Sequence, residues 1–203
     1  MLQNRVTPLG DIIRTNARGA WMGNRGLIHN KQQEINRSFR LKAWIICLLK
    51  FKDRHRPVMA PGQYTELFFL DEATAFAAGH RPCAECRRED FIKFKSFWVK
   101  ANAGYSFDMK TPVGKIDEII HQERISEDGS KKTSKIAAGD IPDGTFILQD
   151  NNPYLVWNKK MYRWSPEGYG KAIPLPATKE ITALTPGSII KAFREGYLPQ
   201  IAL

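Results

Sequence analysis

The chain has few cysteines, no long apolar run and little acidic charge near its start, and each absence excludes a class of protein. Three cysteines among 203 residues are too few, and odd in number, for a disulfide framework, which favours a reducing compartment. The longest apolar run, 44–49, lies between Lys42 and Lys50 and is far shorter than the roughly 20 residues of a bilayer span. The first residues contain no signal-peptide core. We therefore predict a cytoplasmic protein without a membrane partner.

The sequence does contain enough apolar material for a folded core. Hydrophobic residues make up 42% of the chain, which excludes wholesale disorder because so much apolar surface can offset the entropy of folding. The length allows one large domain or two small ones.

Positive charge is concentrated near the N-terminus. The net charge is +10, and residues 1–60 alone contain 12 Lys and Arg against three Asp and Glu. Arginine dominates this segment, and its planar guanidinium group matches the geometry of phosphate oxygens. DNA or another nucleic acid is therefore the predicted partner, ahead of a membrane surface because no basic amphipathic helix is evident. The alternative is a solvated basic face without a dedicated ligand.

Short strands and separate helices indicate an α+β fold with mixed short-strand sheets and segregated helices. Strands are predicted at 41–51, 64–70, 145–148, 154–157, 161–164 and 181–184. A helix is predicted at 71–79, with Asp71 as its N-cap and Gly79 as its stop. Further helices are predicted from the 83–86 turn to about 103, with Phe91, Phe94 and Trp98 in one apolar stripe, at 111–120 and at 185–194. We divide the chain into a basic N-terminal region, 1–104, and a helix and β-meander region, 105–203. The two regions are either separate domains or one compact domain.

The sharpest local motif is the Cys-x-x-Cys pair of Cys83 and Cys86, which is followed by a helical pattern. Such a turn brings two thiolates to one zinc ion, and tetrahedral zinc needs two further ligands. The available donors are Cys47, His29, His55 and His80. A redox dithiol is a second interpretation, although the βαβ context that it requires is absent. In a third interpretation the two residues are ordinary thiols at the start of a helix.

Residues 64–86, and above all the segment Gly79-His-Arg-Pro-Cys-Ala-Glu-Cys86, resemble the metal-binding domain of the Ada DNA-repair family. The resemblance covers about a sixth of the chain and implies a β-hairpin, a short helix and a cysteine knuckle in the N-terminal half. In the family, an upstream Cys-x₃-Cys or His-x₃-Cys pair supplies the other two zinc ligands. Here the corresponding spacing joins His55 to Met59, and a thioether is a poor zinc ligand.

The resemblance therefore implies a zinc site that draws on Cys83, Cys86, Cys47 and His55, with His80 as an alternative to complete it. It also implies that Arg81, Arg87 and Arg88 face a DNA backbone. The methyl-accepting cysteine of the family belongs to the upstream pair, and no cysteine occupies that position here. We therefore do not expect self-methylating phosphotriester repair.

A second group of residues lies in the glycine-rich segment 18–29. Glycines let a backbone approach a phosphate closely, and Trp21 could stack on a base. The alternative is a structural connection with Trp21 in the core. The residues predicted to bind nucleic acid are Arg14, Arg18, Trp21, Arg25, Arg54, Arg56, Arg81, Arg87 and Arg88.

Asp11 is the only acidic residue among the first 33 residues, in an arginine-rich surrounding. A carboxylate in a basic groove suits a DNA glycosylase, where it stabilises an oxocarbenium ion, or a nuclease, where it holds a metal. With Asn24 and with His29 as a base, it forms the predicted catalytic group. A structural salt bridge is the alternative for Asp11.

These patterns leave three functional hypotheses. The first is a DNA-binding protein that acts in DNA repair, modification or phage defence. The second is a DNA-processing enzyme, a glycosylase or hydrolase acting on a modified base. The third is a structural or partner-binding protein, which the aromatic content alone favours.

Overall fold

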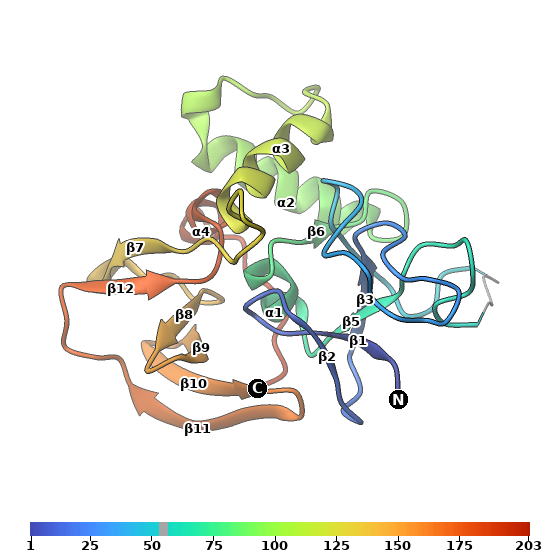
Figure 1. The fold of residues 1–203 in the computed structure, drawn as a ribbon. Coiled ribbons are helices and arrows are strands. Elements are labelled where there is room, and N and C mark those ends of the chain that lie inside the picture. The colour runs from blue at the N-terminus through green and yellow to red at the C-terminus, as the bar shows by residue number, and fades with distance from the viewer. Residues whose placement is uncertain (53–56) are drawn as a thin grey trace.

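The computed structural model describes residues 1–52 and 57–203, and it confirms the predicted α+β class: four α-helices and two six-stranded sheets in the described residues (Figure 1). The first sheet contains β1 (Gln3–Val6), β2 (Ile12–Arg14), β3 (Trp21–Asn24), β4 (Ile45–Cys47), β5 (Leu67–Phe69) and β6 (Arg81–Pro82). The second contains β7 (Ser134–Ala137), β8 (Phe146–Gln149), β9 (Asn152–Trp157), β10 (Lys160–Ser165), β11 (Gly168–Pro174) and β12 (Glu180–Ala183). The helices are α1 (Glu72–Ala77), α2 (Arg88–Ala101), α3 (Val113–Arg124) and α4 (Gly187–Arg194), with short 3-10 helices at Ala103–Tyr105 and Ala138–Asp140.

The first sheet has the strand order β2-β1-β5-β3-β4-β6. The β1–β2 hairpin turns between Thr7 and Asp11, where Thr7 N donates to Asp11 O at 3.0 Å. β3 pairs antiparallel with both β4 and β5, whereas β6 pairs parallel with β4 at the sheet edge. Strands that are far apart in the sequence are therefore neighbours in the sheet.

The second sheet is largely a meander, with the order β11-β10-β9-β8-β12-β7. Its turns at Asp150–Asn151 and Asn158–Lys159 have positive φ at both central residues, which is the twist that two-residue hairpins require. β8, β9, β10 and β12 confirm the predicted strands. β7 and β11 were not predicted, because most of their residues are exposed and carry no alternating apolar pattern.

α1 lies between the two sheets, as Figure 1 shows, and all six of its residues are buried. Asp71 is its N-cap, as predicted: the carboxylate accepts a hydrogen bond from Thr74 N at 2.8 Å. The predicted stop at Gly79 is also confirmed, with a φ of +86° that glycine adopts without strain. This central helix packs on both sheets.

The largest core cluster joins the two halves of the sequence. Phe76 of α1 and Phe94 and Trp98 of α2 pack with Ile116 of α3 and Phe193 of α4. Aromatic rings meet edge to face in this cluster, with centroids of Phe76 and Phe193 5.4 Å apart. Regions 1–104 and 105–203 therefore share one hydrophobic core.

Candidate metal centre

Two parallel strands bring the cysteines together. β4 and β6 pair through Ile45 with Arg81 and Ile46 with Pro82, so that both strands end at the same edge. Cys83 N continues the ladder by donating to Ile46 O at 2.9 Å. Cys47 closes β4, and Cys83 directly follows β6, so their side chains start from adjacent positions.

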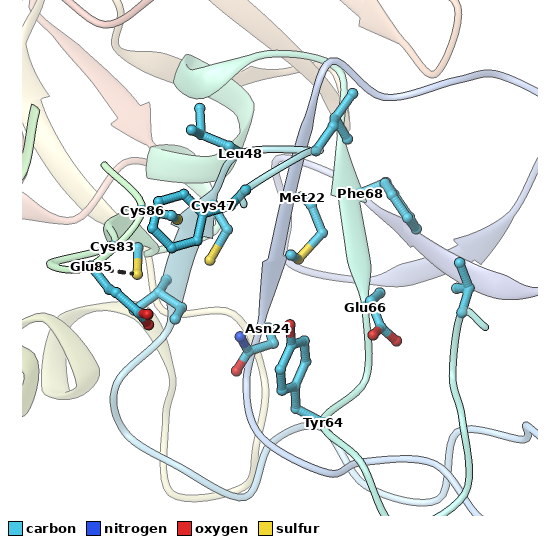
Figure 2. Close-up of a pocket in the computed structure, with 14 residues that line it drawn as sticks. Met22, Asn24, Cys47, Leu48, Tyr64, Glu66, Phe68, Cys83, Glu85 and Cys86 are labelled. Atoms are coloured by element: carbon cyan, nitrogen blue, oxygen red, sulfur yellow. Dashed lines mark hydrogen bonds between the residues drawn. The ribbon is translucent and has the colours of Figure 1, made fainter. Parts of the chain in front are cut away.

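The third thiol comes from the turn before α2. The Sγ atoms of Cys47, Cys83 and Cys86 all lie within 4.8 Å of one another (Figure 2), and in the described residues this is the one group of three or more metal-ligating side chains. Cys47 and Cys83 are buried and Cys86 is half-buried. We call these residues the cysteine centre.

The three thiols do not share their protons equally. Hydrogen bonds from Cys47 and Cys86 lower the pKa of Cys83, and the hydrogen bond to Cys83 raises the pKa of Cys47. The Cys83 sulfur also accepts from the backbone N–H of Glu85 at 3.4 Å. Of the three thiols, Cys83 therefore loses its proton most readily, and a divalent cation would displace the protons that remain on the centre.

The donor set fits zinc. Tetrahedral zinc with Zn–S bonds of about 2.3 Å places its sulfurs roughly 3.8 Å apart, a spacing that the cysteine centre can adopt with small side-chain shifts. Thiolates select Zn²⁺ or iron–sulfur chemistry over Mg²⁺ and Ca²⁺.

The residues considered as a fourth zinc ligand are not part of the cysteine centre in the described residues. His55 lies outside the described residues. His80 is fully buried and its Nε2 accepts from Arg25 Nε at 3.3 Å, so the ring faces the arginine and not the thiols. Met59 is buried and its backbone N–H donates to Glu66 Oε2 at 2.8 Å. In the described residues, Cys47 is the one predicted additional ligand that lies with Cys83 and Cys86.

The cysteine centre opens on a cavity of about 610 Å³, which we call the cysteine cavity. It covers one face of the first sheet, because Met22 and Phe68 are paired in register and Met22 is paired with Cys47. The opposite face carries Ile46, Leu67 and Phe69 into the core. The polar groups in the cavity wall, which Figure 2 shows, are Asn24, Tyr64, Glu66 and Glu85.

Tyr64, Glu66 and Glu85 were not predicted from the sequence. Glu66 lies between the core residues Thr65 and Leu67. Because side chains alternate between the two faces of a strand, this pattern could have predicted that Glu66 faces away from the core. Glu85 lies between the two cysteines of the motif and is exposed.

Three of the predicted phosphate-binding arginines are buried, and two of these, Arg81 and Arg87, form ion pairs inside the protein. Arg81 donates to both oxygens of Asp117 at 2.9 and 2.8 Å. Arg87 pairs with Glu72 at 2.7 Å and lies over the Trp21 ring at 4.0 Å. A phosphate could reach neither guanidinium group without breaking a buried ion pair, and the structure therefore assigns them a structural role.

Arg25 is the third buried arginine, and it lies over the ring of Trp44. Trp21 is half-buried between Arg87 and the core. Arg14, Arg18 and Arg88 are exposed. Arg54 and Arg56 lie outside the described residues.

The structure does not bring the predicted catalytic group together. Asp11 is exposed and lines a different hollow from Asn24, whose side chain faces the cysteine cavity. His29 is buried with Nδ1 2.6 Å from the Thr65 hydroxyl. The physical reason is the alternation of side chains at the end of β3: Asn24 faces the cysteine cavity, whereas the next residue, Arg25, lies on the opposite side and donates to Gly10 O beside Asp11.

None of the helices in the described residues is long and apolar enough to cross a bilayer. Comparisons with protein-family models, with curated proteins and with solved structures gave no match.

Proposed function

We propose that the protein binds one zinc ion through Cys47, Cys83 and Cys86, with His55 as the fourth ligand. The observation that carries this proposal is the convergence of the only three cysteines of the chain at one point. Because Cys47 lies far in the sequence from the turn with Cys83 and Cys86, proximity within one local turn does not account for the third thiol. In this proposal the protein is a variant of the Ada-type knuckle in which Cys47 and His55 replace the upstream ligand pair.

Metal analysis tests the zinc site directly. We expect about one zinc per chain in the purified protein, and a visible spectrum with thiolate bands after exchange for Co²⁺. Cys83→Ser should abolish stoichiometric binding. His55→Gln should weaken zinc binding by tenfold or more, a typical effect of losing a ligand interaction.

His121→Gln is the matched control, because His121 contacts Arg124 rather than the thiols and should leave zinc affinity unchanged. A zinc content far below one per chain in the wild type would overturn the proposal. Equal zinc affinity in His55→Gln and the wild type would exclude His55 as the fourth ligand.

We propose further that the protein binds DNA through phosphate contacts, in repair, modification or defence. Support comes from the exposed cations of the N-terminal segment. In the described part of the chain, no ion pair involves any of them: Arg14, Arg18, Lys31, Arg37, Arg40, Lys42, Lys50 and Lys52. Unneutralised surface cations favour a polyanion because its condensed counterions are released on binding.

Salt dependence is the test of DNA binding. Fluorescence anisotropy with a labelled duplex should give a log K that falls with log salt by about 0.9 for each phosphate contact. Arg14→Gln and Arg18→Gln should each reduce the slope by about one contact. Lys171→Gln, an exposed cation on β11, is the control and should leave the slope unchanged. Negligible affinity at low salt would overturn the proposal.

A second candidate function is hydrolysis or base excision on a modified base, and the cysteine cavity favours it. Its volume of about 610 Å³ lies within the range of small-molecule sites, about 300–1,000 Å³. Polar side chains in its wall could orient a flipped base. Incubation with modified and unmodified duplexes, scored for abasic sites and strand breaks, tests this function. Products in the wild type and none in Cys83→Ser are expected, and no product from any duplex would overturn it.

A further inference from the structure

A second hollow of about 480 Å³ lies where the β1–β2 turn, the loop at 35–38 and the turn after α3 meet. We call it the basic hollow. Its charged lining is unbalanced, because four cationic side chains face it together with a single carboxylate, that of Asp11. The cations are Arg25, Arg37, Arg124 and Lys131.

The two buried arginines of the basic hollow are held by neutral groups. Arg25 and Arg124 both lie over the ring of Trp44, with guanidinium carbons 3.8 and 3.7 Å from its centroid. Arg25 donates to Gly10 O at 3.0 Å, and Arg124 donates to Gly79 O at 2.7 Å. Backbone carbonyls and an aromatic ring fix the orientation of a guanidinium group without cancelling its charge.

The cations also repel one another. Burial, and then the charges of Arg25 and Arg124, lower the pKa of Lys131 to about 7. Burial lowers the pKa of Arg25 to about 9, and Asp11 opposes this change. Arg124 has the further feature that its buried Nε has no hydrogen-bond partner in the described residues. Buried charge of one sign normally has a partner, and the lining of the hollow contains one exposed carboxylate for these three cations. The other carboxylate that acts on Arg124, that of Asp117, is already paired with Arg81.

We propose that the basic hollow binds the phosphate group of a phosphate-bearing ligand. Guanidinium forks and an ammonium group form charge-assisted hydrogen bonds with phosphate oxygens, and Arg25, Arg124 and Lys131 supply both kinds of donor. A phosphate carries close to two negative charges, which matches the excess of cations over Asp11 better than a single carboxylate does. The hollow is also large enough for atoms beyond the phosphate.

The location of the hollow separates this proposal from the metal proposal. It is lined by the β1–β2 turn and the end of α3, and it shares none of its lining residues with the cysteine cavity. Loss of zinc binding and loss of phosphate binding are therefore distinguishable outcomes.

Titration of the full-length protein with inorganic phosphate, followed by calorimetry and by thermal unfolding, is the test. We expect saturable binding of one phosphate per chain and a rise in melting temperature that sodium chloride at equal ionic strength does not produce. Stabilisation by phosphate no larger than that by chloride would overturn the proposal.

Three variants test how individual residues affect the affinity for phosphate. Lys131→Gln should weaken phosphate binding about tenfold, because it removes a charge-assisted hydrogen bond. Asp11→Asn should tighten binding by about threefold or more, because it removes the carboxylate that repels the ligand. Lys171→Gln should have no effect. Asp11 is exposed, so its variant folds even if a change at Lys131 disturbs the structure. Unchanged affinity in Asp11→Asn, with Lys131→Gln equal to Lys171→Gln, would overturn the proposal.

Two probes identify the source of the phosphate. A mononucleotide, and a pair of single-stranded oligonucleotides with 5′-phosphate and 5′-hydroxyl ends, are compared under the same conditions. Tighter binding of the phosphorylated oligonucleotide identifies the end of a nucleic acid as the ligand. Equal binding of the two oligonucleotides, with tight binding of the mononucleotide, identifies a free phosphate ester. Binding of neither probe above the chloride background would contradict the proposal.

Discussion

Arg81 and Asp117 are both nearly inaccessible to solvent and are joined by two parallel hydrogen bonds. A pair of this kind is costly to break, about 3–5 kcal/mol, because removal of one partner leaves the other charge buried and alone. Arg81 lies two residues before Cys83, at the parallel pairing of β6 with β4. The ion pair therefore anchors the strand that positions the thiols, and its contribution to the cysteine centre is structural.

His80 and His121 make stability depend on pH. Burial, and then the positive charge of Arg124, lower the pKa of His121 to about 4, and burial together with Arg25 lowers that of His80 well below its usual range. The unfolded chain takes up these protons near pH 6.5, where the folded protein does not. Stability should therefore fall as pH decreases below about 6.5, by up to about 1.4 kcal/mol per pH unit for the buried His80 and by less for the partly exposed His121.

Urea unfolding between about pH 7.5 and 5 measures this slope, in a range where most carboxylates stay ionised. His121→Gln should make the slope shallower than that of the wild type, because one of the two histidines is removed. An identical slope in the variant would contradict the lowered pKa of His121, because it would mean that this residue binds its proton equally in the folded and the unfolded protein.

At the scale of elements, the connection from α1 to β6 depends on Gly79. Its φ of +86° is a conformation that other residues adopt at a cost of about 1–2 kcal/mol. A Cβ at this position would also lie 2.8 Å from Cβ of Arg124 and closer to its Cδ. The close approach of the backbone to Arg124 allows the Gly79 carbonyl to accept the hydrogen bond that orients the arginine.

Gly79→Ala should therefore reduce the free energy of unfolding by about 2–4 kcal/mol, as strain adds to overpacking. Gly104→Ala is the matched control, because no atom lies within 4 Å of a Cβ built there, and its effect should be within about 0.5 kcal/mol. Chemical denaturation measures both. Equal stability of the two variants would show that Arg124 moves aside without cost.

The sequence predicts the elements whose signals are local. The N-cap Asp71, the stop at Gly79 and the apolar stripe of α2 with Phe94 and Trp98 all act within one helix, and the structure confirms them. The parallel pairing of β4 with β6 has no local signal, because it joins residues far apart in the chain. For that reason the sequence indicates a zinc site at the cysteine pair but leaves the role of the third thiol open.

No local sequence pattern predicts the burial of Arg81 and Arg87 either. Arg81 finds its partner in Asp117 of α3, and Arg87 finds Glu72 of α1, so each pairing depends on the completed fold. The sequence places these arginines beside a cysteine motif, and this position alone predicts phosphate ligands. Only the fold shows the carboxylates with which they pair. The cationic lining of the basic hollow, including Arg124 and Lys131 from a region of net negative charge, was hidden for the same reason.

At the scale of the whole molecule, the two halves of the chain depend on each other. The shared core takes Ile28 and Phe76 from the first half and Ile120, Ile189 and Tyr197 from the second. A fragment of residues 1–104 would expose the apolar faces of α1 and α2 that the second half covers. We therefore expect this fragment to lack a cooperative thermal transition in circular dichroism and to be degraded rapidly by protease. A sharp transition in the fragment would show that its part of the core is sufficient.

The three thiols also act on the topology of the chain. Any bond between Cys47 and Cys83, through a metal ion or as a disulfide, closes the backbone between them into a ring. The chain-entropy model gives about 4 kcal/mol for a ring of this length, from the loss of disorder in the unfolded state. Part of the wall of the cysteine cavity belongs to this ring, since Leu48, Tyr64 and Phe68 lie inside it. A chelator or an oxidant would therefore change both the melting temperature of the protein and the shape of the cysteine cavity.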